Sequence, residues 1–271
     1  MFSGFVHLHT HSSYSPMWGT STLEALCEAV RSQGHDTFAL TDTNGLYGAI
    51  RFLEVAKRAG LKPILGTEII QAQHRAVLLA KSPEGYGNLC RLLSARHEDE
   101  PFEFIETLQR YRSGLVILSD DFQALTAWRA QSGEDLYVEL TPGADLQKAV
   151  SFSRQNCIPP VATTRAALLR PTDFEAHRLL RAIAENTTLS RLRPDCCCAP
   201  SHWLMPSSVM ARALPHVPEA LSNTRRIANQ CATAWDFQTT IFPSFREMSA
   251  DGAVETLRAT TYNGAVWRYG V

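Results

Sequence analysis

The sequence predicts an α/β protein in which short buried strands alternate with amphipathic helices. Apolar runs of four or five residues recur along the first two thirds of the chain, and hydrophobic residues make up 45% of its 271 residues. Helical patterns of about 10 to 15 residues separate these runs, which is typical of a sheet with right-handed parallel crossovers. Six or seven such units in about 190 residues favour a barrel over an open sheet.

The expected elements follow one another in a regular order. The expected strands are Phe5–Leu8, Thr37–Thr41, Pro63–Gly66, Ala76–Ala80, Leu115–Leu118, Leu136–Leu140 and Pro160–Thr163. The expected helices between them are Leu23–Gly34, Leu46–Gly60, Glu84–Arg96, Phe102–Tyr111, Gln123–Ala130 and Leu146–Gln155. The first helix is preceded by Ser21-Thr22-Leu23-Glu24, which has capping-box spacing.

The pattern changes after Arg170. A helix is expected over Pro171–Asn186, and its apolar face should pack back onto the barrel because it needs cover. A loop rich in Cys, Pro and Ser then leads to a helix that begins at Pro218. An extended segment over Phe242–Phe245 and a last helix over Ala250–Tyr269 complete the chain. We therefore expect a barrel over residues 1–190 and a loop and helical extension over residues 191–271.

Composition restricts the partners and the compartment. The 26 Lys and Arg residues nearly balance the 27 Asp and Glu residues, so no global basic field attracts a phosphate backbone. No run of about 18 apolar residues is present, which excludes a membrane span. The first residues lack the pattern of a signal peptide, and the seven cysteines are expected to be reduced thiols in a cytoplasmic protein.

Three histidines fall within the first eleven residues. On a strand, His7, His9 and His11 would point to one face. The strand pattern ends near Thr10, so His9 and His11 are expected to converge at a strand end, where barrel sites are built. Imidazole is a common ligand for Zn, Mn and Fe, but a hydrogen-bonded histidine cluster without metal is the alternative.

Carboxylates follow other expected strands. Asp42 ends the second strand, Glu68 lies in the third, and Asp120-Asp121 follow the fifth. Each alone is explained as a surface carboxylate. Their recurrence at one end of the expected barrel favours a shared site. By contrast, Cys196-Cys197-Cys198 with His202 is not interpreted as a zinc site, because vicinal thiolates cannot easily meet one tetrahedral ion.

The ordered motifs resemble a known family. Residues 5–12 with Tyr14-Ser15 are similar to the opening of the PHP (polymerase and histidinol phosphatase) domain of bacterial C-family DNA polymerases. The DNA polymerase III α-subunit type is the nearest match, in particular its error-prone branch. The supporting segments run in the same order along the chain: residues 39–42, 44–48, 60–68, 78–81, 85–89, 218–224 and 268–270.

This resemblance implies a fold and an activity. The fold is a PHP-type, seven-stranded (β/α) barrel, a distorted relative of the TIM barrel, here with a helical C-terminal extension. Active members hold a trinuclear metal centre that hydrolyses phosphoesters, and some act as 3′–5′ exonucleases. Metal-bound water is the nucleophile in such a centre.

The sequence retains only part of that centre. His9, His11 and Glu68 match family ligands, while Asp42, His74 and Asp121 lie where they could complete the shell. Other ligand positions carry non-ligands: Trp18, Thr43, Arg75, Arg165 and Ala167. A trinuclear cluster needs about eight or nine ligands, so at most one weakly bound Zn or Mn is expected. A guanidinium paired with the remaining carboxylates can stabilise an emptied metal site.

Three functions follow from the resemblance. The first is a structural module that supports a polymerase core, in the same or a separate chain, and meets DNA only through that core. The second is a metal-dependent phosphoesterase or 3′–5′ exonuclease with a reduced metal site. The third is a module that binds a phosphate or nucleotide through its arginines without turnover. The sequence ends at Val271, where the resemblance places the start of the core, and it holds no palm-domain carboxylates, so it is not expected to polymerise by itself.

Overall fold

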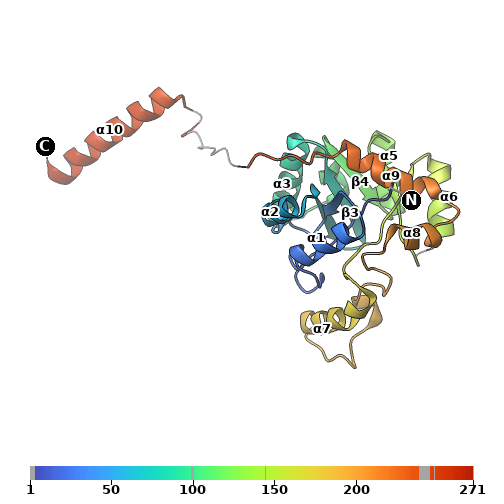
Figure 1. Cartoon of the computed structure of the whole chain (residues 1–271). Helices are drawn as coiled ribbons and strands as arrows, with labels where there is room; N and C mark the ends of the chain where they lie inside the picture. Colours follow the sequence, from blue (N-terminus) through green and yellow to red (C-terminus); the bar gives the residue numbers. More distant parts are fainter. Residues whose placement is uncertain (1–3, 99–100, 144, 238–244, 247, 271) are drawn as a thin grey trace. The chain divides into compact units, whose positions relative to one another are not determined.

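The computed structural model describes residues 4–98, 101–143, 145–237, 245–246 and 248–270. It divides the chain into two compact units, Met1–Ala234 and Trp235–Val271 (Figure 1). The boundary expected from the sequence, at residues 190 and 191, falls inside the first unit.

The first unit is built around one curled sheet of six strands, which follow one another in chain order. They are β1 (Thr37–Leu40), β2 (Lys62–Gln71), β3 (His74–Ala80), β4 (Leu115–Ser119), β5 (Leu136–Leu140) and β6 (Pro160–Ala162). Six of the seven expected strands are thus confirmed. The alternation of strands and helices along the chain is that of an α/β fold.

The expectation of an all-parallel sheet is wrong at β3. This strand pairs antiparallel with both β2 and β4, whereas β1–β2, β4–β5 and β5–β6 are parallel. Only Ala72 and Gln73 link β2 to β3, and Ala72 has a positive φ of 51°. A link that short forms a hairpin, and a hairpin permits only antiparallel pairing.

The expected strand Phe5–Leu8 is extended but does not join the sheet as a strand. The amides of Ala39 and Thr41 donate to the carbonyls of His7 and Thr10, at 2.8 and 2.9 Å. The amide of Ala166 donates to the carbonyl of His9 at 3.0 Å. The N-terminal segment therefore bridges β1 and the chain that follows β6, but a complete seven-stranded barrel is not confirmed.

Helices cover the sheet between its strands. They are α1 (Leu23–Ser32), α2 (Ala49–Ala59), α3 (Pro83–Glu98), α4 (Phe104–Arg110), α5 (Phe122–Gln131) and α6 (Leu146–Asn156). The cap of α1 is Thr22 rather than Ser21, because the Thr22 side chain accepts from the amide of Ala25. A central core cluster of side chains from the strands includes Ile64, Val77, Leu79, Val116 and Leu118.

Residues after β6 form α7 (Phe174–Ala184), α8 (Ser207–Ala213) and α9 (Pro218–Gln230). The expectation that the apolar face of α7 is covered is wrong: Leu179 and Ile183 are 51% and 57% exposed. This helix instead buries His177 and Ala182. Helix α9 returns the chain to the sheet and packs against β6. Its Thr224 side chain accepts a hydrogen bond from the Val6 amide at 2.9 Å.

The second unit contains α10 (Ala250–Tyr269), at the bounds expected from the sequence. This helix has no buried residue. The expected extended segment Phe242–Phe245 lies outside the described residues except for Phe245. Among the described helices, none combines the length and apolar character needed to cross a membrane.

Candidate functional site

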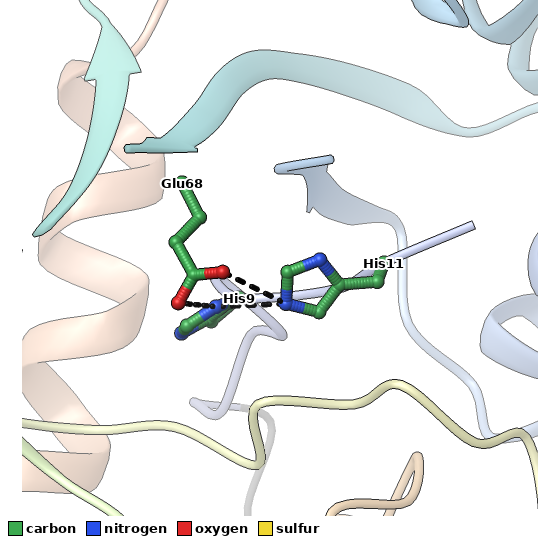
Figure 2. A group of neighbouring side chains, drawn as sticks. All are labelled: His9, His11 and Glu68. Atoms are coloured by element: carbon green, nitrogen blue, oxygen red, sulfur yellow. Dashed lines mark hydrogen bonds and ion pairs between the residues drawn. The ribbon is translucent and has the colours of Figure 1, made fainter. Parts of the chain in front are cut away.

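The structure brings together the three retained family positions, His9, His11 and Glu68 (Figure 2). The Nε2 atoms of the two histidines are 3.1 Å apart. Oε1 of Glu68 is 3.5 Å from His9 Nε2, and Oε2 is 3.6 Å from His11 Nε2. All three side chains are buried, and one ligand atom from each lies within 4.8 Å of the others. The group has the geometry to hold a metal ion.

The first of the three histidines does not join this group. Nε2 of His7 lies 3.3 Å from the side-chain oxygen of Gln33, and its ring meets that of His35 edge to face. The expectation that His7 shares a face with His9 and His11 is therefore wrong. The N-terminal segment does not keep regular strand geometry, so the alternation of side chains fails there.

Glu139 is a central residue that the sequence argument missed. It comes from β5, and its Oε1 accepts from Nδ1 of His9 at 2.7 Å. Its Oε2 accepts from Nε and an Nη atom of Arg165 at 3.0 and 2.7 Å. The signal in the sequence was a carboxylate inside an otherwise apolar strand, because a buried charge needs a partner.

Arg165 and Arg75 are joined through one carboxylate. Arg75 from β3 donates to both oxygens of Asp120, at 2.8 and 2.6 Å. Arg165 approaches the same carboxylate at 2.7 Å while it holds Glu139. The backbone of Arg165 is left-handed, with φ of 45°, a strained conformation for this residue type that the surrounding contacts must hold in place.

The electrostatics of the group follow from these contacts. Burial alone would lower the pKa of His9, but the carboxylates of Glu139 and Glu68 raise it to about 9. Burial alone would raise the pKa of Glu68, but the neighbouring His9 lowers it to about 2. Burial lowers the pKa of His11 to about 4. At neutral pH, His9 is therefore charged, His11 is neutral, and Glu68 is ionised.

Asp42 lies apart from the His9–His11–Glu68 group. Its carboxylate accepts from the Ser12 amide at 2.7 Å, from the Ser12 hydroxyl at 2.8 Å and from the Ser15 hydroxyl at 2.6 Å. Those donors occupy most of its lone pairs. Asp42 thus fixes the loop that follows His11.

His74 and Asp121 form a separate pair. Nδ1 of His74 is 2.6 Å from one oxygen of Asp121. The other oxygen of Asp121 accepts from the amide of Ala124 and caps α5. Neither side chain is part of the three-residue group.

The remaining substituted positions are filled by packing and hydrogen bonding. The Trp18 ring lies edge to face against His177, 5.1 Å between centroids, and 5.3 Å from the guanidinium carbon of Arg181. Ala167 is buried in the same cluster. The hydroxyl of Thr43 donates to Glu68 at 3.2 Å.

A second residue near the group was also missed as a site residue. Burial, together with the charges of His9 and Arg75, lowers the pKa of His202 to about 4. The His202 ring therefore interacts electrostatically with the site. The sequence analysis considered His202 only as a zinc ligand beside Cys196-Cys197-Cys198.

Known proteins resemble this chain over most of its length. Residues 7–140 match the PHP domain family. The error-prone DNA polymerase of Symbiobacterium thermophilum is 28% identical over 310 residues, which cover 98% of this chain and 29% of that protein. The DNA polymerase III subunit α of Halalkalibacterium halodurans is 28% identical over 98% of this chain and 26% of its own length. The chain thus spans less than a third of these relatives.

A solved structure overlaps the fold more loosely. It is a two-domain protein from Bacteroides vulgatus, described as containing a predicted PHP-like metal-dependent phosphoesterase. It is 13% identical, with a TM-score of 0.46, over 82% of this chain and 63% of that one. A likeness at this level carries no conclusion about activity.

Proposed function

We propose that this chain, whose residues 7–140 match the PHP domain family, is a structural, non-hydrolytic module of a DNA polymerase of the DNA polymerase III α or error-prone type. Its partner is the polymerase core, in the same chain or a separate one, and contact with DNA is made through that core. The curated relatives support this context because they are DNA polymerases that match nearly the whole chain.

The observation that carries the non-hydrolytic role is the balance of charge in the site. Three carboxylates gather there, from Glu68, Asp120 and Glu139. Three cations face them: the guanidinium groups of Arg75 and Arg165 and the protonated ring of His9. Burial raises the pKa of Asp120, and two guanidinium groups within 2.8 Å of its carboxylate oppose that shift.

A metal ion would disturb this balance. It would add charge to a group that is already neutral, and it would have to displace the proton from His9, because a metal ligand must be a neutral imidazole. The arginines supply the positive charge that several metal ions supply in an intact centre. The site is therefore stable as a network of ion pairs.

A metal-dependent phosphoesterase or exonuclease is the second candidate. Three protein ligands with an open fourth position are the arrangement of catalytic zinc sites, and His9, His11 and Glu68 provide three. In such a site the three residues would hold one Zn or Mn, whose chemistry is to activate water. Asp42, His74 and Asp121 do not add ligands here because they are engaged elsewhere.

The third candidate, phosphate or nucleotide binding through the arginines, has less support. Arg75 is bidentate to Asp120, and Arg165 is shared between Asp120 and Glu139. Neither guanidinium is free to pair with a phosphate unless an internal ion pair breaks.

Metal content separates the first two candidates. The protein is purified without chelators and analysed for Zn and Mn beside a His9→Ala/His11→Ala variant, with circular dichroism to verify that the variant folds. We expect less than about 0.1 ion per chain in both proteins. One ion per chain that is lost in the variant, together with hydrolysis of a simple phosphate ester, would replace our proposal by the second candidate.

A further inference from the structure

Two tyrosine rings pack on glycines of one short turn beside the site. The turn is Asn44–Gly48, and a Cβ atom added to Gly45 would lie 2.3 Å from Cε2 of Tyr47. A Cβ atom added to Gly48 would lie 2.8 Å from Cδ2 of Tyr14. Each ring therefore lies close against glycine backbone, and a larger residue at either position would have to displace the ring.

The turn, which contains Tyr47, is held to one strand by hydrogen bonds. The amide of Asn44 donates to the carbonyl of Glu68 at 2.7 Å, and its side-chain oxygen accepts from the amide of Ile70 at 2.9 Å. The amide of Gly45 lies 3.3 Å from the hydroxyl of Thr67. The turn is thus fixed to β2, the strand that carries Glu68.

Tyr14 lies in the loop that follows His11 and is also held by hydrogen bonds. Its amide donates to the hydroxyl of Ser12 at 3.1 Å, and Ser12 in turn donates to the buried Asp42. Both rings lie on backbone that is held by hydrogen bonds, and Tyr47 is 65% exposed and Tyr14 37% exposed. When a planar ligand stacks on these rings, the protein would lose little conformational entropy.

We propose that Tyr14 and Tyr47 form a stacking platform for unpaired nucleobases next to the His9–His11–Glu68 group. The inference rests on the proposed function, which places the chain in a polymerase and therefore near single-stranded template. It adds a direct contact with unpaired bases to the contact that the polymerase core makes with DNA. Tyr14 follows His11 by three residues, and Thr43, whose hydroxyl contacts Glu68, precedes the turn. Stacking on aromatic rings tolerates any base, which suits a surface that meets template of every sequence.

The charges near the platform do not favour contacts with phosphate groups, on which most nucleic-acid binding depends. Arg51, one turn along α2, is paired with both Glu24 and Glu54. The whole chain carries a net charge of -1. Stacking rather than phosphate contact is thus the source of affinity, so the dissociation constant depends only weakly on salt concentration.

The test is fluorescence anisotropy of a short fluorescein-labelled oligothymidylate, titrated with the full chain in the presence of EDTA. Tyr14→Leu and Tyr47→Leu should each weaken binding about tenfold, because each removes one stacking surface. The Tyr→Phe variants should bind as the wild type does, because they keep the rings. Tyr262→Leu, at an exposed tyrosine of α10, is the matched control and should have no effect.

Two results would overturn the platform. One is the absence of saturable binding by the wild type; the other is binding that both leucine variants retain and that falls steeply with salt, as phosphate contacts do. Gly48→Ala adds a check on geometry, since it displaces the Tyr14 ring and should weaken binding without loss of the folded spectrum. Cleavage of the oligonucleotide when Mn is added would overturn the non-hydrolytic function but leave the platform intact, so the two failures are distinguishable.

Discussion

At the scale of single residues, we propose that arginine side chains take the place of metal ligands that the resemblance implies. Arg165 stands where the resemblance places a metal ligand, and it pairs with Glu139 and Asp120 from two neighbouring strand ends. Its strained backbone shows that the surrounding contacts over-determine its position. The guanidinium thus pairs with both carboxylates, and we propose that it takes the place of an ion there.

Removal of Arg165 should be costly because Glu139 and Asp120 lose the guanidinium that they share, and only His9 and Arg75 remain as their charged partners. We expect Arg165→Ala to lower the free energy of unfolding by about 3 to 5 kcal/mol, measured by urea denaturation. The control is Arg178→Ala, which breaks an exposed pair with Glu175 and should change stability little.

A second variant tests the cause of that loss. Arg165→Ala combined with Glu139→Gln removes both charges and should recover part of the stability. A single variant as stable as the wild type would contradict the view that Arg165 balances the site.

At the scale of elements, specific polar contacts attach two helices to other segments of the chain. In α9, the hydroxyl of Thr224 accepts from the Val6 amide and donates to the carbonyl of Leu221. In α7, His177 donates from Nδ1 to the carbonyl of Trp18 at 2.8 Å and accepts at Nε2 from the amide of Cys198 at 2.9 Å. Each contact joins segments that are distant in sequence.

The contact from α9 predicts a difference between two substitutions at one position. Thr224→Val keeps the shape but leaves the buried Val6 amide without an acceptor, which should cost about 1 to 3 kcal/mol. Thr224→Ser keeps the hydroxyl and should cost less. Urea denaturation of the two variants measures the difference; equal losses would show that the hydrogen bond is not what matters.

The contact from α7 predicts a dependence of stability on pH. Burial and the charge of Arg181 lower the pKa of His177 below its ordinary value of 6.5. The unfolded chain then takes up a proton that the folded chain does not, so this contribution is full above pH 6.5 and is lost as the pH falls below it.

Unfolding of the wild type and His177→Gln, compared between pH 7.5 and pH 5, measures this contribution. The stability of the variant should fall less over that range. His216→Gln, at an exposed histidine, is the control and should behave as the wild type does. A pH dependence that is identical in all three proteins would contradict the assignment.

At the scale of the whole molecule, the first unit contains the buried core and the complete candidate site. The core cluster extends from Val6 in the N-terminal segment to Cys231, so it closes within Met1–Ala234. In the second unit, α10 buries no side chain, and isolated helices are marginal in water.

A fragment that ends at Ala234 should therefore unfold cooperatively by itself. We expect its thermal midpoint to lie within about 4 °C of that of the full chain, measured by calorimetry. The peptide 248–270 should show little helix in circular dichroism. A fragment that lacks a cooperative transition would mean that the core depends on the second unit.

Local patterns in the sequence determined most of the elements. Six strands and the helices between them are local features, set by periodicity, by caps such as Thr22 and by stops such as Gly60, whose φ is 72°. The grouping of His9 and His11 with Glu68 was also predictable, from the spacing of the two histidines and from the family resemblance, which implies Glu68 as a ligand. The direction of β3 was not foreseen, although the two-residue link at Ala72 and Gln73 contains the reason.

Only the tertiary structure decided which charges meet. Glu139 and Arg165 are 26 residues apart and come from different strand ends, so no local pattern joins them. The same holds for Asp42, which two serines of another loop hold away from the site, and for α7, whose apolar face stays exposed while His177 is buried. Secondary structure arises from neighbours in sequence, whereas ion pairing and burial arise from neighbours in space, and that difference separates what the sequence determined from what the fold decided.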